Sequence, residues 1–103
     1  MAVFNNGIPD CYYSGSGGDI WLEMKWLSKV PKRKSTALNI NLSELQKKWL
    51  IGRHNEGRNV GVILGTSQGC LIMPGLDWQD EFTIENLTSS RKDVAQWIET
   101  KVI

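Results

Sequence analysis

The strongest constraint on the fold is residues 7–25, where a glycine-rich segment separates two potential strands. Residues 14–18, SGSGG, have the composition of a tight turn, because glycine adopts positive φ values without steric cost. Residues 19–27 are rich in Trp, Ile and Leu, and their side chains would alternate between two faces of a strand. The stretch therefore predicts a β-hairpin.

Alternation along residues 19–27 assigns each side chain of the second strand to one of two faces. One face carries Trp21, Glu23 and Lys25. The other face is apolar and is predicted to turn into the core; it carries Ile20, Leu22, Met24 and Trp26.

The length of the hairpin loop decides which residues face each other, and the sequence leaves two registers open. With a four-residue loop, Tyr13 faces Ile20, and Asp10 then falls opposite Glu23. With a five-residue loop, Tyr13 faces Asp19, and Asp10 then lies diagonally to Glu23. Cross-strand neighbours of either kind lie about 4.5 to 8 Å apart, so both registers bring the two carboxylates together.

Two adjacent carboxylates repel each other unless a cation binds between them. Hard oxygen ligands in small number favour Mg²⁺, with Mn²⁺ able to substitute, over zinc. Lys25 follows Glu23 by about 7 Å along the strand. A divalent cation beside a lysine suits phosphodiester hydrolysis, because both stabilise the negative charge that develops on the phosphate. The alternative is that Asp10 starts a turn while Glu23 and Lys25 form a solvated pair on an exposed sheet face.

The pair Pro9-Asp10 followed by Glu23-Met24-Lys25 resembles the signature of the PD-(D/E)XK nuclease superfamily. The resemblance is more extensive to small stand-alone VRR-NUC domains and similar phage nucleases. The chain has GIPD at residues 7–10, LSELQKKW at residues 42–49, and a strand-like NVGVI at residues 59–63 after a glycine. The resemblance covers roughly residues 7–65.

The resemblance implies that Asp10, Glu23 and the Met24 carbonyl bind the metal, that Lys25 is the catalytic lysine, and that Gln46 assists as a further catalytic residue. One departure concerns a glutamate that the superfamily usually places on a helix before the Pro-Asp strand. Nine residues precede Asp10 here, and none is acidic. The place of that glutamate is therefore expected to be empty or taken by Asn5, Asn6, water or a partner subunit.

Gln46 also has a purely structural explanation. Ser43 is a good helix N-cap, and a glutamine three residues later completes a capping box. The predicted helix would bury a stripe formed by Leu45, Trp49 and Gly52, and would end at Gly57.

Positive charge is concentrated in one part of the chain, although the formal net charge is only +1. Residues 25–58 hold nine Lys or Arg and two Glu, which is the distribution expected of a phosphate-binding surface. A solvated basic face is the alternative. The candidate DNA contacts are Lys29, Lys32, Arg33, Lys34, Lys47, Lys48 and Arg53.

The remainder of the chain completes an α/β pattern. Residues 60–64 are continuously apolar, as in a central strand, and would pair in parallel with residues 19–27 through a helical crossover. Residues 70–73 suggest an antiparallel edge strand, and Ser89 or Ser90 would cap a last helix. We predict one domain, residues 1–103, with a mixed four- to five-stranded sheet flanked by helices. The resemblance implies the restriction-endonuclease-like type, without the usual first helix.

Several functional classes are disfavoured. Cys11 and Cys70 are too few for a disulfide framework and lack a zinc-binding pattern, so both are predicted to be free thiols. Neither a membrane span nor a signal peptide is apparent, which predicts a cytoplasmic protein, in the host cytoplasm if phage-encoded. No nucleotide cofactor is expected.

The resemblance implies a magnesium-dependent DNA endonuclease, acting on branched DNA such as Holliday junctions. We expect a homodimer, because two symmetric nicks require two sites. A site-specific nicking, restriction or homing endonuclease is the first alternative. A DNA-binding module that has the nuclease fold without catalysis is the second.

Overall fold

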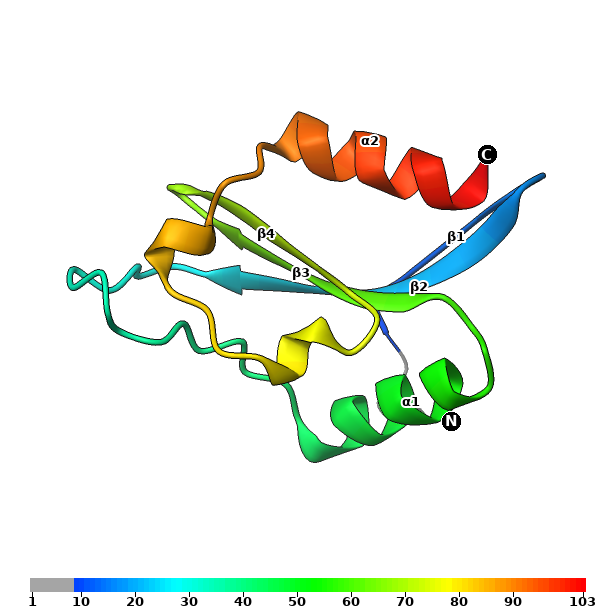
Figure 1. Cartoon of the computed structure of the whole chain (residues 1–103), viewed down its shortest axis with the longest axis horizontal. Helices are drawn as coiled ribbons and strands as arrows, with labels where there is room; N and C mark the ends of the chain where they lie inside the picture. Colours follow the sequence, from blue (N-terminus) through cyan, green and yellow to red (C-terminus); the bar gives the residue numbers. More distant parts are fainter. Residues whose placement is uncertain (1–8) are drawn as a thin grey trace.

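The computed structural model describes residues 9–103, which form a four-stranded mixed sheet with one α-helix on each face (Figure 1). The predicted α/β class and the mixed sheet flanked by helices are confirmed. The predictions for residues 1–8, including the roles of Asn5 and Asn6 and the lack of a first helix, lie outside the described residues. In chain order the elements are β1 (Cys11–Gly15), β2 (Gly18–Leu27), α1 (Glu44–Asn55), β3 (Val60–Thr66), β4 (Gly69–Pro74), two 3₁₀ turns (Asp77–Gln79 and Ile84–Asn86) and α2 (Arg91–Val102).

The strand order is β1-β2-β3-β4. β2 pairs with β1 in antiparallel and with β3 in parallel, and the crossover between β2 and β3 contains α1. β4 pairs with β3 in antiparallel at the edge. The parallel pairing of β2 with β3 through a helical crossover and the antiparallel edge strand were both predicted from the sequence.

The hairpin adopts the first of the two predicted registers, with Tyr13 opposite Ile20. Pairing continues to Gly15 and Gly18, so the turn is only two residues long, shorter than either predicted loop. The tip packs on the end of α2, where the Gly17 N–H donates to the Val102 carbonyl over 2.9 Å. A Cβ on Gly15 would collide with the Val102 backbone, so the close approach requires glycine there.

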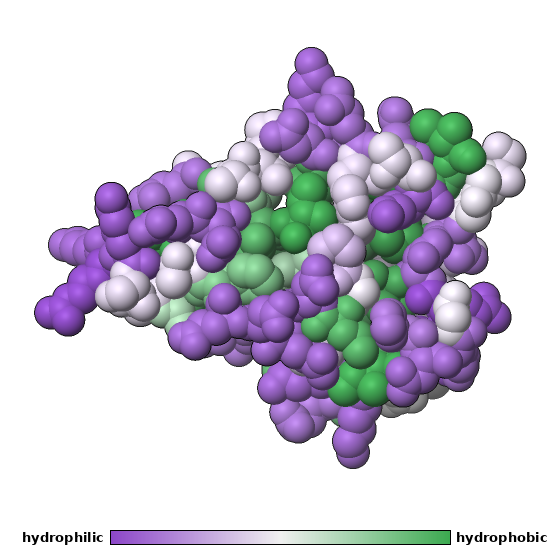
Figure 2. All heavy atoms as spheres, viewed as in Figure 1, coloured by the Kyte–Doolittle hydropathy of each residue, from purple (hydrophilic) through white to green (hydrophobic). Residues whose placement is uncertain are grey.

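The core is divided by the sheet into two apolar layers. The layer under α1 includes Leu50, Val62 and Leu64, together with Trp78 from the segment after β4. The layer under α2 is smaller and consists of Ile20, Leu22, Ile63, Cys70 and Val94. Hydrophilic side chains dominate the outer surface, and apolar side chains are visible between the two helices, over the sheet (Figure 2).

The predicted buried stripe of α1 was partly wrong. Leu45 is 55% exposed, whereas Leu50 is fully buried. The helix is therefore rotated so that Leu50, rather than Leu45, faces β3. Trp49 is half-buried at the border of the same layer.

The predicted core face of β2 was correct only in its first half. Ile20 and Leu22 are buried under α2, but Met24 is 36% and Trp26 59% exposed. The α2-side core reaches only the first half of the strand, so the later residues lack a covering layer. Trp26 instead lies against Gly65, where a Cβ would approach the indole to 3.0 Å.

Both cysteines are free thiols, as predicted. Within residues 9–103, no helix has the length and apolarity needed to cross a membrane.

Candidate active site

The hairpin places Asp10 beside the middle of β2. Cys11 pairs with Leu22, so the residue before β1, Asp10, lies opposite Glu23. The Asp10 carboxylate accepts a long hydrogen bond, 3.4 Å, from the Met24 N–H. The predicted juxtaposition of the two carboxyl groups is therefore present.

Glu23 is the feature that most distinguishes this region. The residue is only 2% exposed, although it carries an ionisable group in a strand covered on that side by the α1 layer. The Lys25 ammonium lies 3.6 Å from Glu23 Oε2. The alternative of a solvated pair on an exposed sheet face is therefore wrong for Glu23.

The second oxygen of the Glu23 carboxyl group has no partner. Glu23 Oε1 is buried and makes no hydrogen bond with any described residue. A buried acceptor of this kind normally costs stability, because it has lost water without gaining a donor. An orphaned carboxylate oxygen next to a second carboxylate fits a bound Mg²⁺ or Mn²⁺, since hard oxygen atoms are the ligands that these cations prefer.

The environment of Glu23 changes its acidity. Burial is the main cause that raises its pKa to about 7, and the neighbouring Asp10 carboxyl group acts in the same direction. Lys25 opposes the shift. The carboxyl group is thus poised between its neutral and charged forms near neutral pH, and a cation would favour the charged form.

Met24 contributes through its backbone. Its N–H faces Asp10, and in a strand the N–H and C=O of one residue point toward the same neighbouring strand. The Met24 carbonyl therefore points to the side of β2 where Asp10 lies, and its role as a third ligand stays a prediction.

Groups of three or more His, Cys, Asp or Glu that could hold a metal do not occur within residues 9–103. The candidate carboxylate ligands within this range are those of Asp10 and Glu23, and their binding of a metal stays a prediction.

The Gln46 side chain forms part of the N-terminal cap of α1. Its side-chain oxygen accepts from the Ser43 N–H over 2.9 Å, and its own N–H donates to the Ser43 hydroxyl over 3.1 Å. This reciprocal pair confirms the capping box. No described hydrogen bond joins Gln46 to Asp10, Glu23 or Lys25, so its role in catalysis stays a prediction.

The predicted DNA contacts fall into two groups. On α1, Lys47 pairs with Glu44 at 3.2 Å and Arg53 pairs with Glu56 at 2.8 Å, so these charges are already compensated. The remaining residues are exposed and form no ion pair within the described chain; they are Lys29, Lys32, Arg33, Lys34 and Lys48.

An aromatic group beside the carboxylates was not predicted. Tyr12 lies over Trp21 with ring centroids 4.3 Å apart, and Trp21 meets Trp49 of α1 edge-on at 5.2 Å. The Tyr12 hydroxyl is fixed by a 2.7 Å hydrogen bond to Asp19. Alternation placed Trp21 on the face of Glu23, but the contact with Trp49 depends on how α1 docks, which the sequence did not reveal.

Comparison with known proteins gives no relative: no family model, no curated protein and no solved structure matches this chain. The resemblance to PD-(D/E)XK nucleases therefore stays a prediction from the sequence motifs.

Proposed function

We propose that this protein is a metal-dependent endodeoxyribonuclease that hydrolyses phosphodiester bonds with Mg²⁺, or with Mn²⁺ in its place. The observation that carries the proposal is the buried Glu23 carboxyl group, which has one oxygen without a described partner, beside Asp10 and Lys25. A structural ion pair would not require the second carboxylate.

Each residue of the site has a distinct task in this proposal. Asp10, Glu23 and the Met24 carbonyl would hold the cation, which when bound offsets the carboxylates and polarises the phosphate. The Lys25 ammonium, held 3.6 Å from Glu23, stabilises the negative charge that develops on the phosphate oxygens during attack. The α1 layer excludes water from Glu23, which strengthens these electrostatic interactions.

The basic loop that follows β2 provides a means of holding DNA. Lys32, Arg33 and Lys34 are exposed and lie a few residues beyond Lys25 in the chain. Contacts between such side chains and phosphates carry no sequence information. Neutralising all three should weaken binding to every DNA sequence and flatten the slope of log K against log salt by about two to three units. An unchanged slope would remove the loop from the interface.

Branched DNA is the substrate that we favour, cut by a homodimer. Exposed Met24 and Trp26 form part of an apolar hollow of about 460 Å³ beside α2, and a second subunit would cover this surface. A two-fold dimer places identical sites on opposing strands, as two symmetric nicks require. Light scattering at micromolar concentration tests the assembly, and a monomer both free and bound to DNA would contradict it.

The decisive experiment is a cleavage panel. Linear, nicked, flapped and four-way DNA are incubated with Mg²⁺, with Mn²⁺ and with a chelator, and Glu23→Gln serves as the matched inactive control. We expect metal-dependent cutting of the four-way substrate. Cutting at one defined site of linear DNA would favour a nicking, restriction or homing enzyme. Tight binding without cleavage in either metal would favour the non-catalytic DNA-binding module.

A further inference from the structure

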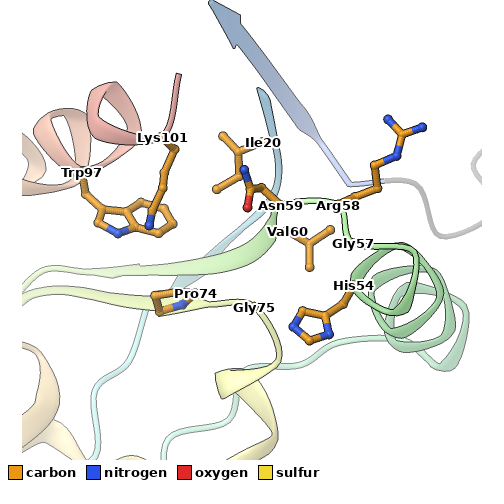
Figure 3. A pocket seen from close by; sticks show the side chains of 10 residues that line it. All are labelled: Ile20, His54, Gly57, Arg58, Asn59, Val60, Pro74, Gly75, Trp97 and Lys101. Atoms are coloured by element: carbon orange, nitrogen blue, oxygen red, sulfur yellow. The ribbon is translucent and has the colours of Figure 1, made fainter. Parts of the chain in front are cut away.

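A second hollow lies at the end of the sheet where β2 begins, beside the end of α2 on which the hairpin tip packs. It measures about 250 Å³ and is formed where the end of α1, the start of β3, the end of β4 and the last turn of α2 meet (Figure 3). Its polar lining consists of His54, Arg58, Asn59 and Lys101. Figure 3 shows His54 and Lys101 directed into the space from opposite sides, with Arg58 turned outward at the rim.

The charge of this lining is one-sided. Three of the residues that border the hollow are basic, and none is acidic. Each ion pair found within residues 9–103 involves other residues: Lys25, Lys47 and Arg53 supply their cations. Basic groups that converge without an acidic partner raise the local positive potential, which attracts an anion.

Neighbouring groups hold the basic side chains without neutralising them. The Lys101 ammonium lies 5.5 Å from the centre of the Trp97 ring, a cation–π arrangement that leaves its charge available. His54 lies against Gly75, where a Cβ would come within 3.4 Å of the imidazole. The carbonyls of the last turn of α1 already accept hydrogen bonds from the N–H groups of residues 56–58. They therefore do not require hydrogen bonds from the basic side chains.

We propose that this hollow binds a phosphate group. A phosphate presents oxygen acceptors in several directions, which suits the His54 imidazole from α1 and the Lys101 ammonium from α2, with the Arg58 guanidinium at the rim. The volume exceeds what a bare phosphate needs, and Trp97 supplies an apolar wall for an attached group. The phosphate could belong to a DNA backbone or to a small phosphate compound.

The position of the hollow is compatible with a DNA strand that also reaches the carboxylates. Val60 borders the hollow and pairs with Trp21, whereas Val62 pairs with Glu23. Val60, at the border of the hollow, is thus two residues, or about 7 Å along the sheet, from the strand partner of Glu23. The proposal itself does not require nuclease activity, because binding of phosphate can be measured without metal or cleavage.

The chain contains a single histidine, which gives a direct reporter. The His54 ring signals are followed by NMR at constant pH while inorganic phosphate is added, with chloride at matched ionic strength as the reference. We expect a saturable shift with phosphate and none with chloride. Lys101→Gln should weaken phosphate binding about tenfold, the loss of one charge-assisted hydrogen bond.

Lys92→Gln is the matched control, because Lys92 is an exposed lysine of the same helix that does not border the hollow. It should bind phosphate within about twofold of the unmodified protein. Arg58→Gln, at an exposed position, is a second variant if Lys101→Gln fails to fold, and should also weaken binding. Either a shift that does not saturate or equal affinity in all variants would overturn the proposal. The basic side chains would then serve only to stabilise the C-terminal ends of the helices.

A DNA arm then identifies the source of the phosphate. A short duplex is added in the presence of a chelator, so that no cleavage occurs. A His54 shift that is lost in Lys101→Gln assigns the hollow to the DNA backbone. A response to inorganic phosphate or to a nucleoside monophosphate but not to the duplex assigns it to a small phosphate compound.

Discussion

The two faces of β2 differ in a way that local sequence does not suggest. Glu23 is 2% exposed, whereas Trp26, three residues later on the opposite face, is 59% exposed. One face is covered by α1 and the segments around it, and the other is covered by α2 only as far as Leu22. An ionisable group is buried and a large apolar group is in water, which reverses the usual preference of both.

Such reversals are costly and tend to mark functional positions. A buried carboxylate without full compensation costs several kcal/mol, and an exposed indole forfeits the free energy of its burial. Natural sequences violate these rules mainly where function requires it. The buried face therefore points to chemistry and the exposed face to association, and the two can be separated by experiment.

The largest expected difference between the faces is in catalysis. Glu23→Gln and Lys25→Ala should each lower DNA cleavage by about 10² or more, because each removes a group that stabilises the transition state. Trp26→Ala, on the other face, is the matched control and should cleave within a few-fold when assayed at a concentration that preserves assembly. DNA affinity should survive Lys25→Ala within several-fold. Near-normal cutting by either buried-face variant at physiological magnesium would remove the site assignment.

Stability should depend on pH through Glu23 when metal is absent. Burial and Asp10 raise its pKa from 4.5 to about 7, so folding favours the protonated form. This contribution is fully present below about pH 4.5 and is lost as pH rises through about 7, a change on the order of 3 kcal/mol.

The measurement is urea unfolding in chelator at pH 5 and pH 8. Glu23→Gln, which cannot ionise, should lose most of this pH dependence, and added Mg²⁺ should stabilise the unmodified protein at pH 8. A variant with the same pH profile as the unmodified protein would show that other groups control it.

The two tryptophans of β2 should differ in what they contribute to stability. Trp21 contacts both Tyr12 and Trp49, and Trp21→Ala should cost about 2 to 4 kcal/mol. Trp26→Ala should cost less than about 1 kcal/mol, because more than half of that residue is already in water. Denaturant midpoints, measured at a protein concentration where the chain is monomeric, would reveal the difference. Equal losses would mean that Trp26 is covered in solution.

The sequence predicted the pairing of the strands better than the burial of their side chains. Alternation along residues 19–27 correctly assigned Glu23 and Lys25 to one face, and the apolar run at residues 60–64 gave the parallel pairing. The same pattern placed Met24 and Trp26 in the core, because periodicity assigns a residue to a face but does not say how far a helix covers it. The burial of Glu23 was not predictable either, since it depends on how the α1 layer docks.

The helix α1 raises a smaller question, whether it only covers the buried face or also contributes a residue to it. The capping box predicts that Gln46→Ala and Ser43→Ala each cost about 1 kcal/mol of stability, because either change removes one half of the same reciprocal pair. We expect their cleavage rates to match within a few-fold, since the Gln46 oxygen is already used by the Ser43 N–H. Ser43 thereby serves as an internal control for the structural part of the effect. A Gln46→Ala variant that cleaves at least tenfold more slowly than Ser43→Ala at equal stability would show that α1 supplies a group to the reaction, and that the covered face of β2 is completed by a residue from outside the sheet.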